Sequence, residues 1–214
     1  MRSSRGLGLL CLALLFAAAP SRANVVVNGS FESPGLSFRS FCITFFTPAC
    51  PAIPAWTGNF YLVNDDSGGG IGGVPAAPIP DGGQYIMIQM TGGATQSVTI
   101  GQAGTYTLSW FDAGRTFFSN IQNYEVVFGG NVLGFFSTAT TSPWLPHILP
   151  LTTGAGTFDL TFQGLNSAGG DNSVFLDDVV LNAPAAVGAP EPGTVGLAVG
   201  ALLAMVGRRL RWSC

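Results

Sequence analysis

The chain has 214 residues, and its eight arginines and eleven acidic residues give a formal net charge of −3 at pH 7. It contains no lysine, and between its two apolar ends the only basic residues are Arg39 and Arg115. Such an acidic surface repels phosphate backbones and argues against nucleic-acid binding, whereas its carboxylates suit divalent cations, calcium above all.

The first 23 residues predict an export signal. Arg2 and Arg5 precede an apolar stretch at 7–19, and Ser21 and Ala23 supply the small residues of a cleavage site after Ala23. An uncleaved membrane helix is the alternative. The stretch is short and a cleavage site follows it directly, so we expect a signal peptide.

Residues 24–183 predict one all-β domain, an antiparallel β-sandwich of the jelly-roll type. At 105–111, Tyr106, Leu108 and Trp110 alternate with polar residues, as in a strand that is buried on one face. The same alternation marks 157–163 and 124–128. Further strands are expected at 24–28, 61–64, 84–90, 94–100, 132–136, 147–151 and 173–182.

Two long segments, 33–54 and 65–83, interrupt this pattern, and segments of that length are functional loops or surface loops without a ligand. Cys42 and Cys50 lie in the first segment. We expect them to form a disulfide, because disulfides persist in exported proteins. Zinc is a poorer explanation, since the chain has one histidine, His147, and no second cysteine pair of the required spacing.

Nothing in the body predicts catalysis. His147 has no nucleophile assigned to it, and no nucleophile-elbow motif is present. Glycoside hydrolysis needs two carboxylates at a set distance, whereas the pairs Asp65-Asp66 and Asp177-Asp178 are sequence neighbours that point to opposite faces of a strand. We therefore expect a protein that is not an enzyme.

Short motifs at both ends of the body resemble the galactose-binding-like jelly rolls. Residues 28–32 read Asn-Gly-Ser-Phe-Glu and residues 175–179 read Phe-Leu-Asp-Asp-Val, with Trp56 and the segments 84–85 and 106–111 between them. The folds that this body resembles include carbohydrate-binding modules. The resemblance therefore implies a jelly roll that binds glycans.

The resemblance also implies a structural Ca²⁺. In such folds the first and last strands lie side by side, so Glu32 would meet Asp177 and Asp178, and adjacent carboxylates repel unless a positive charge lies between them. The implied ligands are the glutamate, an aspartate and backbone carbonyls. A solvated acidic patch or a capped turn is the alternative.

Sugar binding requires exposed aromatic rings with a few polar groups nearby. Trp144, which lies between prolines in an expected loop, is the first candidate, whereas Trp110 belongs to a clean inward face and is expected in the core. The alternative for any such ring is a place in the core or in an interface. The remaining candidates are Trp56, Tyr61, Phe60 and the pair Phe117-Phe118.

After a linker at 184–189, residues 190–214 resemble the PEP-CTERM sorting signal of Gram-negative bacteria. An apolar run at 194–207, shorter than the roughly 20 residues that span a bilayer comfortably, lies between a Pro-Glu-Pro motif and an arginine cluster. The resemblance implies a transient inner-membrane anchor that an exosortase-type membrane protease cuts, and a permanent anchor is the alternative. The residues that carry it are Pro190, Glu191, Pro192, Arg208, Arg209 and Arg211.

These features together predict an exported, non-enzymatic protein that is sorted to the cell envelope, the outer surface or the medium. The sorting resemblance implies an association with exopolysaccharide or the biofilm matrix, and the jelly-roll resemblance implies that glycan binding mediates it. The alternative is a structural or adhesive surface protein that binds protein partners or itself. A secreted glycan hydrolase is a more distant third.

Overall fold

The computed structural model describes residues 23–46, 49–64, 78–116, 121–140 and 142–184. The predicted sorting signal and, apart from Ala23, the predicted signal peptide lie outside these residues. Arg22–Pro184 form one compact unit. Within the described ranges no helix is long and apolar enough to cross a membrane.

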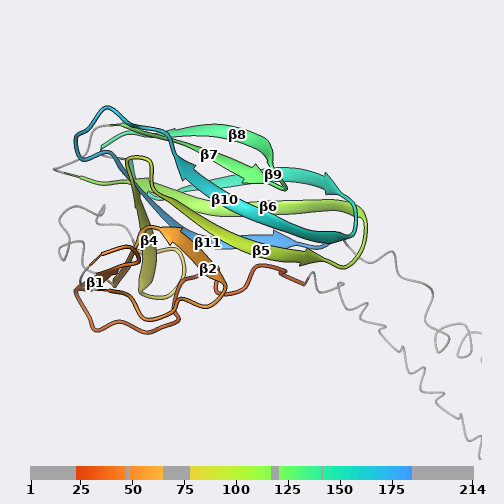
Figure 1. The fold of residues 1–214 in the computed structure, drawn as a ribbon, viewed down its shortest axis with the longest axis horizontal. Helices are drawn as coiled ribbons and strands as arrows, with labels where there is room; N and C mark the ends of the chain where they lie inside the picture. The colour runs from red at the N-terminus through yellow and green to blue at the C-terminus, as the bar shows by residue number, and fades with distance from the viewer. Residues whose placement is uncertain (1–22, 47–48, 65–77, 117–120, 141, 185–214) are drawn as a thin grey trace, which may run out of the picture. The chain divides into compact units, whose positions relative to one another are not determined.

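The described chain is an all-β sandwich of two antiparallel sheets (Figure 1). One sheet has the strand order β1-β3-β4-β11-β6-β9, and the other has the order β2-β5-β10-β7-β8. The predicted fold class, an antiparallel jelly-roll sandwich, is confirmed. The strands are β1 (Ser40–Ile43), β2 (Trp56–Asn59), β3 (Tyr61–Asn64), β4 (Gln84–Gln89), β5 (Gly93–Ile100), β6 (Gly104–Gly114), β7 (Gln122–Phe128), β8 (Asn131–Thr138), β9 (Leu145–Thr153), β10 (Gly156–Gly164) and β11 (Ser173–Asn182).

Each of the strands β3 to β11 overlaps a strand that the sequence predicts. On β5, β6, β7 and β10 buried residues alternate with more accessible ones, as expected for strands with one face in the core. Tyr106, Leu108 and Trp110 are buried on the inner face of β6 as expected. On β10, Leu160 and Phe162 pack into the same core from the opposite sheet. The space between the sheets is therefore filled by the predicted inward faces.

The strand expected at 24–28 is wrong. Only Asn24 makes a β-bridge, to Asn182, and the chain then turns through Asn28 and Phe31, which both have positive φ angles of 53° and 57°. The expected neighbourhood of the two ends is nevertheless present, since Val25 N–H donates to the carbonyl of Leu181. The opening segment is thus a turn that lies along the last strand.

Two short strands, β1 and β2, were not predicted. β1 lies inside the segment 33–54, which the sequence suggests is a loop, and it pairs with β3. β2 pairs with β5. Phe41, on β1, is exposed, so this strand has no clean apolar alternation to mark it.

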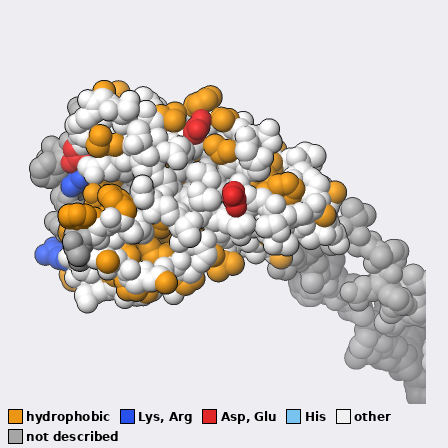
Figure 2. Space-filling model, viewed as in Figure 1, with side chains coloured by type: hydrophobic (Ala, Val, Ile, Leu, Met, Phe, Trp, Pro, Cys, Tyr) orange, Lys and Arg blue, Asp and Glu red, His pale blue; other side chains and the backbone are white. Residues whose placement is uncertain are grey.

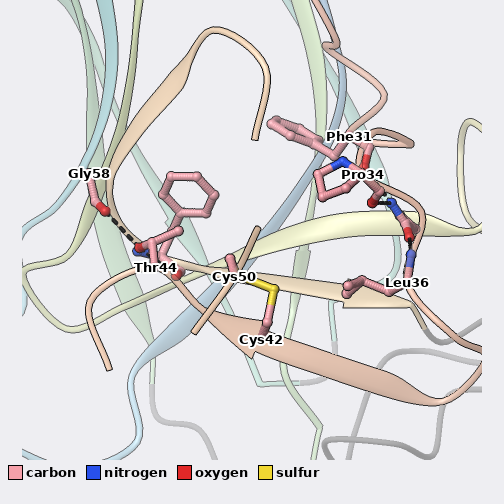
Figure 3. The surroundings of a disulfide bond; sticks show 9 residues. Phe31, Pro34, Leu36, Cys42, Thr44, Cys50 and Gly58 are labelled. Carbon is pink, nitrogen blue, oxygen red and sulfur yellow. Dashed lines mark hydrogen bonds between the residues drawn. A yellow bond between two sulfur atoms is a disulfide. The ribbon is translucent and has the colours of Figure 1, made fainter. Parts of the chain in front are cut away.

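The predicted disulfide is present between Cys42 and Cys50 (Figure 3). It joins β1 to the segment that returns toward β2, and the bonded residues are eight positions apart. Figure 3 also shows the Thr44 hydroxyl directed at the carbonyl of Gly58, to which it donates a hydrogen bond of 2.6 Å. A cross-link over so short a loop is expected to stabilise the fold by about 2–3 kcal/mol.

The outer face of the six-stranded sheet carries a second apolar cluster, separate from the main core. Its fully buried members are Val63, Tyr85, Met87, Ala113 and Phe175. Tyr61 and Trp144 are half-buried at its margin.

Candidate functional site

A pocket of about 260 Å³ opens where the chain passes twice between the two sheets. The first crossing joins Asn59, at the end of β2, to Tyr61, at the start of β3, and the second joins Gln89 of β4 to Gly93 of β5. We call this cavity the Tyr61 pocket. It is lined by Phe45, Asn59, Tyr61, Gln89, Met90, Thr91 and Gly92.

Aromatic rings form one wall of the Tyr61 pocket. Phe45 is 53% exposed and stands edge-on to Tyr61, with 5.8 Å between the ring centroids and 90° between the ring planes. Phe41 lies on Tyr61 as well, at 6.4 Å. Figure 2 shows hydrophobic side chains gathered at the end of the molecule that carries β1 and β2. This end therefore presents accessible ring surface next to a cavity.

The segment that carries Phe45 is fixed at both of its sides. Thr44 N–H donates to the carbonyl of Phe60 at 3.0 Å, and the Thr44 hydroxyl accepts from Phe60 N–H at 2.9 Å. The Cys42–Cys50 disulfide links the two ends of the same segment. Phe45 is thus held against the first crossing, which places its ring beside Tyr61.

A chain of polar contacts runs from the pocket into the protein. The Tyr61 hydroxyl donates to Gln89 Oε1 at 3.1 Å, and Gln89 Nε2 donates to Asp171 Oδ1 at 2.6 Å. Arg115 Nη1 in turn donates to both oxygens of Asp171, at 3.0 and 2.9 Å. These bonds fix which way the Gln89 amide points, and they place the Arg115 charge directly against a carboxylate.

Trp56 is not an exposed sugar-stacking ring, and that expectation is wrong. Its side chain is 4% exposed and lies in the core between Phe31 and Phe162, at centroid distances of 5.2 and 6.5 Å. Its indole N–H donates to the carbonyls of Val27 and Asn28, both at 3.1 Å. Trp56 is a core residue of the sandwich, held by β2 pairing with β5.

Trp144 meets the expectation of an exposed ring only in part. It is half-buried and packs edge-on against Tyr85 at 5.6 Å, and its indole nitrogen is buried without a hydrogen-bond partner among the described residues. Of the remaining candidates, Phe60 is fully buried and the pair Phe117-Phe118 lies outside the described residues. Of the predicted sugar-binding rings, Tyr61 lines the Tyr61 pocket, whereas the buried Trp56 borders a second cavity of about 270 Å³.

Glu32 and Asp177 of the predicted calcium site both bind the turn that precedes β4, which the sequence prediction did not include. Glu32 Oε1 accepts the N–H groups of Gly83 and Gln84, at 2.8 and 2.6 Å. Gly82 has a φ of 69°, and a Cβ there would lie 2.4 Å from the Glu32 side chain. Glu32 therefore caps this turn, which was the alternative to a metal ligand.

Asp177 is held by the same turn. Its two oxygens accept N–H groups of Asp81 and Asp178, at 3.0 and 2.7 Å. Burial raises the pKa of Asp177 to about 8, with a smaller contribution from the charges of Asp178 and Asp81, while the two backbone bonds oppose the shift. Burial, followed by the charge of Asp81, also raises the pKa of Asp178.

The fit of these side chains to Ca²⁺ is poor. Oxygens of Glu32 and Asp177 already accept backbone N–H groups. Within the described ranges no three His, Cys, Asp or Glu side chains are grouped so that they could hold a metal ion. The calcium thus stays a prediction that comes from the resemblance alone.

His147 belongs to a buried polar network that the sequence does not reveal. Its Nε2 lies 3.0 Å from Asp112 Oδ2, and its ring stacks on Trp110 at a centroid distance of 5.0 Å. Tyr124 donates to the same Asp112 oxygen at 2.6 Å and accepts from the indole of Trp110 at 3.0 Å. Burial, and then Asp112, raise the pKa of Tyr124. The network links β6, β7 and β9.

No protein-family model matches this sequence, and no curated protein matches it either. Solved structures do. A Stig cyclase from Fischerella sp. TAU, in complex with (3Z)-3-(1-methyl-2-pyrrolidinylidene)-3H-indole, is 16% identical with a TM-score of 0.55, over 78% of this chain and 100% of its own.

Carbohydrate-binding modules are also among the similar structures. TmCBM61 in complex with β-1,4-galactotriose is 17% identical over 74% of this chain and 97% of its own, with a TM-score of 0.49. A family 16 carbohydrate-binding module is 13% identical over 74% and 99%, with a TM-score of 0.41. At such identities a likeness concerns the fold alone. The Stig cyclase, with its TM-score of 0.55, is therefore similar to this chain in fold, and the ligand of this chain depends on its own residues.

Proposed function

We propose that this protein binds glycans without acting as an enzyme, and that the Tyr61 pocket is its binding site. The observation that supports the proposal is the pairing of an exposed ring, Phe45, with the amides of Asn59 and Gln89 in one cavity. Aromatic rings offer an apolar platform to the C–H face of a sugar, and amides bond its hydroxyl groups.

Polysaccharide affinity gels test this proposal. Phe45→Ala should weaken binding about five- to thirtyfold, because a central aromatic contact of an interface contributes about 1–2 kcal/mol. Phe135→Ala is the matched control, since Phe135 is a phenylalanine on β8 that is 70% exposed and lies outside the pocket lining. Loss of retardation in the control variant, with Phe45→Ala unchanged, would place the glycan elsewhere.

We further propose that the protein is exported and sorted to the cell surface, and that an exosortase-type protease cuts it near Pro190-Glu191-Pro192 and removes the end that carries this motif. This part rests on the sequence of the two ends alone. Intact-mass analysis of the protein recovered from culture should find a chain that begins at Asn24 and ends near Ala189. A mass that retains residues 190–214 would indicate a permanent anchor instead.

A structural or adhesive role is the second candidate. Phe135 on β8 and Ile148 on β9 are 70% and 69% exposed, and both strands lie at sheet edges. On β9, however, Pro146 and Pro150 lack the N–H groups that strand addition uses. Self-association that grows with concentration, that Phe135→Ala removes and that no glycan affects would favour this role over glycan binding.

A further inference from the structure

We propose that the Tyr61 pocket takes one uncharged sugar unit at the end of a glycan chain. This inference rests on the proposed function and names the class of glycan. It follows from the size of the pocket, from how its base is closed and from the charges around it.

The size of the Tyr61 pocket suits a single unit. Its volume of about 260 Å³ lies below the roughly 300–1,000 Å³ of cavities that enclose drug-sized ligands. The ring wall is also short, because Tyr61 and Phe45 are the only aromatic side chains among the described residues of its lining. A long polysaccharide segment would therefore find stacking surface for one unit only.

The base of the pocket is closed by the two crossings, which lie in close contact. A Cβ added to Gly92 would lie 2.4 Å from the carbonyl oxygen of Asn59, so no side chain fits between them. Gly58 is as tight, with 2.2 Å from such a Cβ to the carbonyl oxygen of Gly93. A polymer cannot thread between these strands, and only a chain end can enter to full depth.

The charges favour a neutral unit. None of the described residues that line the pocket is charged. The cation that the polar chain connects to the pocket is Arg115, and its guanidinium lies 2.9 Å from Asp171. Acidic residues also greatly outnumber basic residues in the body of the chain, so the protein as a whole repels a uronate or sulfate group. The described pocket lining holds no cation that would offset this repulsion.

The proposal is tested by calorimetric titration of the purified protein with neutral oligosaccharides of one to six glucose, galactose or mannose units, and with oligogalacturonates of the same lengths. For a neutral series that binds, affinity should change less than twofold from two units to six. Oligogalacturonates should bind at least tenfold more weakly. Asn59→Ala should weaken the neutral series at every length by the same factor, with Phe135→Ala as the control.

The outcomes separate the two proposals. An affinity that rises tenfold or more between two and six units would show a groove and overturn recognition of the chain end. A preference for oligogalacturonates that is lost in Phe45→Ala would overturn the neutral class and leave glycan binding at the pocket intact. Binding of no oligosaccharide and no polysaccharide would overturn both.

Discussion

Replacing Trp56 by alanine should lower the free energy of unfolding by about 3–5 kcal/mol, the usual cost of removing a large buried aromatic side chain. The ring fills the space between Phe31 and Phe162, and its N–H satisfies the carbonyls of Val27 and Asn28. Urea unfolding followed by circular dichroism measures the effect. Any loss of glycan binding in this variant should be proportional to the fraction of unfolded protein. At urea concentrations below the unfolding transition, the variant should bind glycan as the natural protein does.

Trp56→Phe is the control for this prediction. It keeps most of the ring volume between Phe31 and Phe162 but removes the N–H donor. It should therefore cost less than the alanine variant, with the lost hydrogen bonding contributing about 1 kcal/mol. A Trp56→Ala variant of unchanged stability that no longer binds glycan would contradict this account, because it would make Trp56 a surface contact.

The free energy of unfolding should fall as the pH rises from about 4 to about 8, because the proton on Asp177 stabilises the folded chain and is lost over this range. Because the folded-state pKa of Asp177 is raised to about 8, the folded chain holds a proton that the unfolded chain has already released. The contribution of this proton to the free energy of unfolding is complete below about pH 4 and is lost as the pH rises past the folded-state pKa of Asp177. Urea unfolding across this range should show a component of up to about 1.4 kcal/mol per pH unit.

Asp177→Asn isolates this component, since asparagine does not titrate. Asp159→Asn, at an exposed acid on β10, should leave the slope as it is in the natural protein. If stability instead rises with pH relative to Asp177→Asn, the buried carboxyl is ionised in the fold.

The same titration tests the predicted Ca²⁺. An ion bound by Glu32, Asp177 and Asp178 would favour their ionised forms, so added calcium would flatten the slope and raise the Tm, and a chelator would lower it. A turn capped by Glu32 and Asp177 gives no such response. Unchanged unfolding with and without calcium would therefore remove the predicted site.

Much of the fold can be predicted from the sequence because strands buried on one face alternate regularly. Tyr106, Leu108 and Trp110 are a clear case. Prediction fails where burial is not periodic. The exposed Phe41 breaks the alternation of β1, and the turn after Asn24 depends on backbone angles at Asn28 and Phe31 that apolar patterning does not encode.

The candidate site was predictable only in part. Tyr61 could be named from its residue type, but its neighbours Phe45 and Gln89 come from distant segments that strand pairing brings together. Trp56 was misassigned because the residue type of a tryptophan does not show whether its ring lies in the core or at the surface. Similarly, the sequence could place Glu32 near Asp177 but could not show that backbone N–H groups already occupy their oxygens.

Nuclear Overhauser contacts between sugar C–H protons and aromatic ring protons, measured on the protein with a bound neutral oligosaccharide, show most directly whether a glycan binds in the Tyr61 pocket. We expect contacts to the rings of Phe45 and Tyr61, with the terminal sugar unit closest. Contacts to Phe135 on β8, with none to Tyr61, would contradict this expectation.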